Sequence, residues 1–156
     1  MGFPGLTTAD ADLFPYLNVA IPGWLCLIFL PRWRGTKIII TLISLSVAVL
    51  YVGLMVNMIL EADGSDGMTQ ILEDFSTFEG VVKLFQNKDV VLGAWSHYIC
   101  FDLLVGYWCA TDAAEKGVPH LLVVPCLFLT CLFGPTGFLM YHIIRFFYAG
   151  FKFKRS

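Results

Sequence analysis

Charged side chains are scarce in this chain: Lys, Arg, Asp and Glu make up 14 % of its 156 residues, whereas a soluble domain has about 25 %. The formal net charge is −2 and the basic residues are scattered singly or in small groups, which argues against a nucleic-acid partner. Neither Cys-x-x-Cys nor His-x-x-x-His occurs, so no metal site is predicted. Hydrophobic residues reach 58 %. We therefore interpret the chain as an integral membrane protein.

Long apolar runs determine the expected fold. Four segments, about residues 13–30, 38–60, 90–110 and 121–147, each offer roughly 18 or more largely apolar residues, the length that a helix needs to cross a bilayer. The polar turns between the first two and the last two are short, and short connections make joined helices antiparallel neighbours. No segment alternates strictly, as a transmembrane strand would. The sequence predicts an all-α membrane four-helix bundle, a single multi-pass domain over residues 1–156.

The connection between the second and third spans is amphipathic. Apolar residues recur at steps of three and four over about residues 67–86, which is one face of a helix. The pattern predicts an interfacial helix that covers one mouth of the bundle, with docking to a partner protein as the alternative. Ser76 and Glu79 have capping-box spacing, which indicates a split into two short helices.

One ionisable residue, Asp102, lies near the middle of the third span. A charge at that depth costs about 2.5–3.5 kcal/mol, so we expect Asp102 to have a partner or a chemical task. Tyr98 lies one helical turn away on the same face, whereas His97 is about 140° around the axis. In a dry site a neutral Asp102 can donate a proton. The alternative is a hydrogen bond that only fixes the bundle.

Further polar residues predict a pocket that opens to one face of the membrane. Counted inward at about 1.5 Å per residue, they fall in one layer beneath the interfacial helix. They are Asn18, Asn57, His97, Tyr141, His142 and Arg145.

Small residues indicate close helix packing. Glycine lets another helix or a flat ligand approach, and proline in a span frees a backbone carbonyl. The residues in question are Gly106, Gly134, Pro135 and Gly137. A simple packing kink near Pro135 is the alternative.

Several motifs together indicate a family. The most specific are Trp95-Ser-His-Tyr, Phe101-Asp-Leu-Leu-Val-Gly106, and Phe133-Gly-Pro-Thr-Gly-Phe-Leu-Met-Tyr141 with Arg145. Pro22-Gly-Trp24, Leu30-Pro-Arg-Trp33, Phe78-Glu-Gly-Val and Pro125-Cys also fit. Over nearly its whole length the chain resembles the "abscisic acid deficient four"-like family of small four-span membrane proteins. Relatives often carry arginine where this chain has Tyr107.

The resemblance implies a plastid membrane (thylakoid or envelope) and a role in forming neoxanthin from violaxanthin, an epoxide-to-allene isomerisation. His97 and Asp102 would serve as base and acid, in either order, and no redox cofactor is needed. The expected partners are membrane lipids and a carotenoid. Residues that would contact the substrate or a pigment are Asn18, Asn57, Trp95, Tyr98, Tyr141, His142 and Arg145.

Two other functions remain open at this point. One is a non-catalytic subunit of a larger photosynthetic membrane complex that binds chlorophyll and carotenoid. In that case His97, His120 or His142 would be a ligand of chlorophyll. Alternatively, His97 and His142, predicted at similar depth, would hold a haem. A transporter is disfavoured because four short spans without repeats offer little machinery for alternating access.

Overall fold

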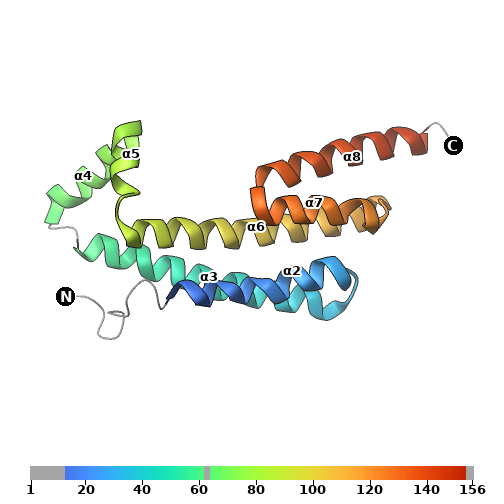
Figure 1. Ribbon diagram of the computed structural model, residues 1–156, viewed down its shortest axis with the longest axis horizontal. Coiled ribbons are helices and arrows are strands. Elements are labelled where there is room, and N and C mark those ends of the chain that lie inside the picture. The colour runs from blue at the N-terminus through green and yellow to red at the C-terminus, as the bar shows by residue number, and fades with distance from the viewer. Residues whose placement is uncertain (1–12, 62–63, 154–156) are drawn as a thin grey trace. The chain divides into compact units, whose positions relative to one another are not determined.

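The computed structural model describes residues 13–61 and 64–153, and this part of the chain contains helices and no strand (Figure 1). The elements are η1 (Phe14–Val19, a 3-10 helix), α2 (Ala20–Phe29), α3 (Arg34–Glu61), α4 (Gly64–Ser76), α5 (Phe78–Leu84), α6 (Lys88–Lys116), α7 (His120–Phe133) and α8 (Pro135–Phe153). The predicted all-α class is confirmed. The chain forms two compact units: one includes Ser46–His97, the other Val19–Leu45 and the described residues from Tyr98 onward.

Two helices, α3 and α6, are long and apolar enough to cross a membrane, judged by length and composition. Their 28 and 29 residues extend about 42 Å, more than the roughly 30 Å of a hydrocarbon core. Both helices are longer than the predicted spans 38–60 and 90–110, because the flanking polar residues continue them. The described residues contain no third helix that meets the same criteria.

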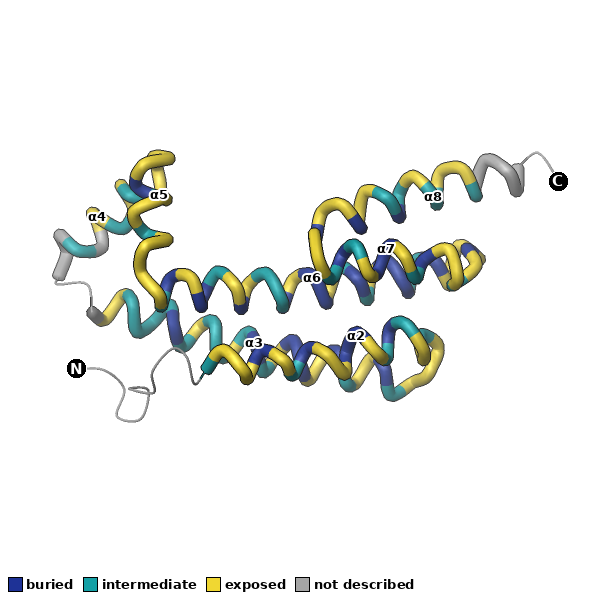
Figure 2. The backbone as a smooth tube through the Cα atoms, in the orientation of Figure 1, coloured by how far each residue is buried: buried dark blue, intermediate teal, exposed yellow. Residues whose placement is uncertain are grey.

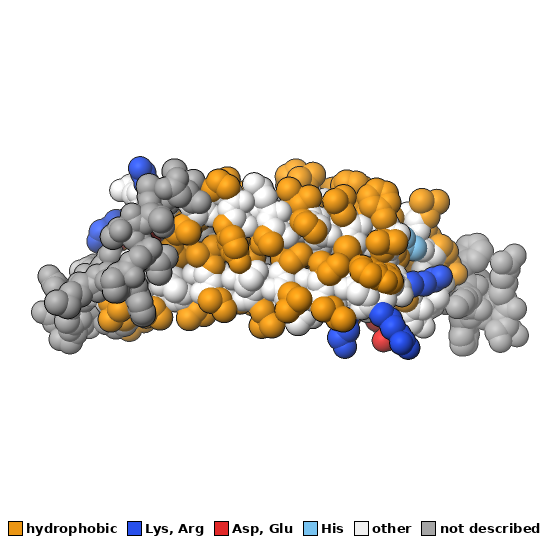
Figure 3. All heavy atoms as spheres, turned by 90° about the horizontal axis from the view of Figure 1, so that it is seen from below, with side chains coloured by type: hydrophobic (Ala, Val, Ile, Leu, Met, Phe, Trp, Pro, Cys, Tyr) orange, Lys and Arg blue, Asp and Glu red, His pale blue; other side chains and the backbone are white. Residues whose placement is uncertain are grey.

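The outer face of α3 carries a stripe of exposed apolar side chains. Its members recur at steps of four and three, so they lie on one side of the helix. They are Ile38, Leu42, Leu45, Val49 and Val52, each more than half exposed. Hydrophobic side chains also cover much of the face shown in Figure 3, with few charged ones among them. Exposure of so much apolar surface is what a lipid-facing helix requires, and it fits a membrane protein.

The first predicted span is not one regular helix. Residues 14–19 form the 3-10 helix η1 and the α-helix begins at Ala20. Pro22 is the third residue of α2, where a missing N–H costs no bond within the helix.

The amphipathic connection forms two helices, α4 and α5, so the predicted split is confirmed while the predicted capping residue is wrong. Thr77 is the N-cap of α5 and accepts a hydrogen bond from the Gly80 N–H at 3.1 Å. The Ser76 hydroxyl instead donates to the Glu73 carbonyl. The Lys83 ammonium pairs with the Asp74 carboxylate at 3.1 Å and joins the two helices.

The continuous fourth span predicted over residues 121–147 is wrong. The helix ends at Phe133, and Gly134 adopts a φ of 36° and a ψ of −92°, a conformation that side-chain-bearing residues avoid. Pro135 then starts α8, where its fixed φ suits the first helical position. As a result α8 folds back and packs on α7 (Figure 1). A kink near Pro135 was the alternative considered for this motif, whereas the structure has a full reversal of the chain at Gly134.

In the second unit the buried residues lie mainly on α2, the first part of α3, α6 and α7 (Figure 2). Gly106 of α6 makes this packing possible. A side-chain carbon added at Gly106 would come within 2.7 Å of the Trp24 indole, so the glycine lets α2 and α6 lie close together.

Candidate functional site

A buried carboxyl group lies against the break between α7 and α8. Asp102 of α6 is only 9 % exposed, and Tyr98 lies one turn earlier on the same helix, close enough for its hydroxyl to interact electrostatically with the Asp102 carboxyl. Its Oδ2 atom is buried and has no hydrogen-bond partner among the described residues. An unpaired buried oxygen costs about 1–3 kcal/mol or more. The site therefore holds a polar group with capacity for one further partner.

The helix break shapes the wall next to Asp102. A side-chain carbon added at Gly134 would lie 2.7 Å from Asp102 Oδ1, so the carboxyl packs directly on the glycine backbone. Gly134 thus serves two purposes: it reverses the chain and it leaves room for the carboxyl.

A second polar cluster joins the C-terminal part of α6 to α8. The fully buried Tyr141 donates its hydroxyl to Asp112 Oδ2 at 2.5 Å. The Arg145 Nε lies 3.1 Å from the same oxygen. Asp112 was missed at the sequence level because residues 111–119 were assigned to a turn, whereas α6 continues to Lys116. Its position one turn after Trp108 on the same helical face was the signal that could have revealed it.

Aromatic rings surround this second cluster. The His142 ring stacks on the Trp108 indole with centroids 5.5 Å apart and an interplanar angle of 9°. Phe138 contacts both rings, with centroids 4.3 Å from His142 and 5.7 Å from Trp108. His142 Nδ1 is 3.0 Å from the Phe138 carbonyl, so Nδ1 carries the proton in this arrangement and Nε2 is left as an acceptor. The ring is therefore held in a fixed orientation.

Removal of the Tyr141 hydroxyl should destabilise the fold. In a Tyr141→Phe variant the Asp112 carboxylate loses a hydrogen bond in a poorly solvated position, and we expect the free energy of unfolding to fall by about 1.5–3 kcal/mol. Tyr107→Phe is the matched control. It removes a tyrosine hydroxyl from α6, the helix that carries Asp112, and should leave the free energy of unfolding unchanged. Chemical denaturation in detergent micelles measures both. Equal stability of the two variants would contradict a stabilising role of this hydrogen bond.

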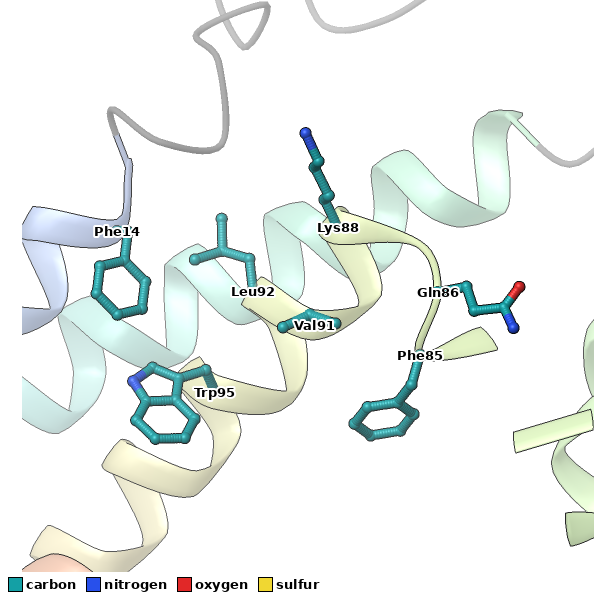
Figure 4. Close-up of a pocket in the computed structure, with 7 residues that line it drawn as sticks. All are labelled: Phe14, Phe85, Gln86, Lys88, Val91, Leu92 and Trp95. Carbon is teal, nitrogen blue, oxygen red and sulfur yellow. The ribbon is translucent and has the colours of Figure 1, made fainter. Parts of the chain in front are cut away.

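The other unit contains an apolar groove of about 570 Å³. Three aromatic side chains line it: Phe14, Phe85 and Trp95. Figure 4 shows the lining residues of α6 following one another from Lys88 to Trp95, with Gln86 just before the helix. Trp95, predicted to contact a substrate or pigment, is thus part of a hollow that can accept an apolar ligand.

The remaining predicted residues of this unit are spread over several places. His97 is exposed and its ring packs near Tyr51, with centroids 5.6 Å apart. Asn18 is exposed at the end of η1, and Asn57 is half-buried in α3.

Of the residues predicted to form one polar layer, Tyr141, His142 and Arg145 of α8 contact Trp108 and Asp112 of α6. The depth count assumed one straight helix from residue 121 to 147, and the reversal at Gly134 removes that assumption for these three residues. The haem alternative, with His97 and His142 as ligands, stays a prediction. No group of three or more His, Cys, Asp or Glu residues suited to a metal occurs in the described ranges.

The comparisons with known proteins give one family. The model of the ABA DEFICIENT 4-like family matches residues 13–141, which include Asp102, Tyr98 and the break at Gly134. None of the curated proteins and none of the solved structures matches the chain.

Proposed function

Because this chain belongs to the ABA DEFICIENT 4-like family, we propose that it converts a xanthophyll epoxide into an allene, as in the formation of neoxanthin from violaxanthin. The family is related to neoxanthin synthesis. The proposal includes a multi-pass arrangement in a plastid membrane, with α3 and α6 as two of the spans.

The reaction is an internal rearrangement. An acid delivers a proton to the epoxide oxygen, and the C–O bond on the polyene side breaks. A base then takes a proton from the neighbouring polyene carbon, and the electron pair of that C–H bond forms the second of two cumulated double bonds. One proton enters and one leaves, so the product is an isomer and no electrons are exchanged.

Asp102 is the acid in this proposal, and the observation that carries it is the unpartnered Oδ2. The carboxyl is buried, its Oδ2 has no hydrogen-bond partner among the described residues, and the Tyr98 hydroxyl lies nearby. A carboxyl group kept neutral in a water-poor site can protonate an ether-type oxygen that reaches the unpartnered Oδ2.

His97 is the proposed base. It lies five residues before Asp102 on α6, and a neutral imidazole is the most common proton acceptor in enzymes. Its contact with the Tyr51 ring supports a fixed ring orientation. The reverse assignment, with Asp102 as base and His97 as acid, uses the same two residues.

Expression of the chain in membranes that contain violaxanthin but no neoxanthin tests the proposal. We expect chromatography of the extracted pigments to reveal a new allenic product that requires the protein. Unchanged violaxanthin in the presence of inserted, folded protein would contradict it. Purified protein should be examined in parallel for its melting temperature, so that a folding failure is recognised.

A pigment-binding subunit without activity is the second candidate, and one observation favours it. The fixed His142 ring presents Nε2 as an acceptor beside exposed apolar rings, and this arrangement suits an axial ligand of chlorophyll magnesium. Chlorophyll that co-purifies with the chain and is lost in a His142→Leu variant would support this function.

A further inference from the structure

We propose that the groove lined by Phe14, Phe85 and Trp95 binds a membrane lipid with an anionic headgroup. The site is distinct from the proposed acid and base, because neither Asp102 nor His97 lines the groove. Its volume of about 570 Å³ is within the roughly 300–1,000 Å³ of typical ligand sites. The occupant is an amphiphile, since the lining combines apolar side chains with one cation.

The apolar part of the groove suits an acyl chain. Val91 and Leu92 of α6 lie between the aromatic side chains of Phe14, Phe85 and Trp95 (Figure 4). Trp95 is seven residues into α6, about 10 Å along the axis from Lys88. The groove therefore extends from the end of a candidate span toward the depth at which lipid chains lie.

The polar end of the groove suits an anion. Lys88 is the first residue of α6 and the only charged residue that lines the groove within the described ranges. It is exposed and makes no ion pair with a described residue, whereas Lys83 is already paired with Asp74. The amino end of a long helix favours negative charge as well. Gln86 adds an amide donor at the same rim.

Nearby acidic groups belong to a different hollow. Asp74 and Asp89 line a separate cavity of about 460 Å³ together with Lys83 and Gln70. Asp89 is next to Lys88 in the sequence, but successive helical residues point about 100° apart. The groove therefore keeps a positive rim, which complements a lipid phosphate.

The test compares lipids retained by the full-length protein. The protein is exchanged into micelles that contain phosphatidylglycerol and phosphatidylcholine in equal amounts, and native mass spectrometry counts the bound molecules. We expect phosphatidylglycerol to be retained preferentially. A Lys88→Gln variant should bind it about fivefold more weakly, because one basic residue near a lipid surface contributes about that factor. Lys37→Gln, which removes an exposed lysine near the start of α3, is the matched control and should have no effect.

A second measurement places the lipid in the groove. Phosphatidylglycerol with brominated chains should quench the emission of Trp95, obtained as the difference between the wild-type protein and a Trp95→Phe variant. Equal retention of both lipids, or equal losses with Lys88→Gln and Lys37→Gln, would overturn the proposal. So would displacement of the lipid by glycerol phosphate, which would identify a free-phosphate site, or by a xanthophyll, which would identify a substrate site.

Discussion

An Asp102→Asn variant is expected to convert the epoxide into the allene at least about 100-fold more slowly than the wild type, while it keeps its fold. Asparagine has nearly the same size and can still accept a hydrogen bond from Tyr98, but it has no acidic proton to deliver. Proton transfer by a positioned side chain contributes about 10²–10⁴-fold to a rate. Chromatography of the pigments gives the conversion, and the melting temperature of the purified variant reports on its fold.

Asp89→Asn is the matched control for this experiment. It makes the same chemical change in the first turn of the same helix, in a residue that lines a hollow to which Asp102 does not belong, so conversion should be unchanged. Normal conversion by Asp102→Asn would contradict the acid role. A parallel loss of conversion and melting temperature in Asp102→Asn would favour the alternative, in which Asp102 only fixes the packing of α6.

The central residue of the site could be predicted from the sequence because its signal is local. An acidic residue in the middle of an apolar run has a large energetic cost, and this cost identified Asp102. Helical periodicity alone placed Tyr98 on the same face, and in the structure its hydroxyl lies close enough to interact electrostatically with the Asp102 carboxyl. Both inferences depend only on one regular helix.

The missed features depend on contacts between helices. Whether the Gly134–Pro135 pair kinks a helix or reverses it is decided by what the following helix can pack against. Here α8 packs on α7, and this moved three predicted residues to the neighbourhood of Asp112. The groove brings Phe14 beside Phe85 and Trp95, which follow it in the chain by 71 and 81 residues, and no periodic pattern contains that information.

The packing of α8 on α7 leads to the second large prediction, which concerns Gly137. A side-chain carbon at Gly137 would collide with the backbone nitrogen and the hydroxyl of Thr130 and with the carbonyl of Cys126. Thr130 is fully buried and its hydroxyl donates to that same carbonyl, so none of these atoms can move aside cheaply. We expect Gly137→Ala to lower the free energy of unfolding by about 3 kcal/mol, at the upper end of typical overpacking.

Gly53→Ala is the matched control, because the same substitution in α3 meets no atom within 4 Å. Alanine is favoured over glycine inside a helix by about 0.8–1 kcal/mol, so this variant should be slightly more stable than the wild type. The two substitutions are chemically identical and should change stability in opposite directions under chemical denaturation in the same detergent. If Gly137→Ala were as stable as Gly53→Ala, α8 could not be packed on Thr130. The chain reversal at Gly134, and the placement of Gly134 beside the Asp102 carboxyl, would then be wrong.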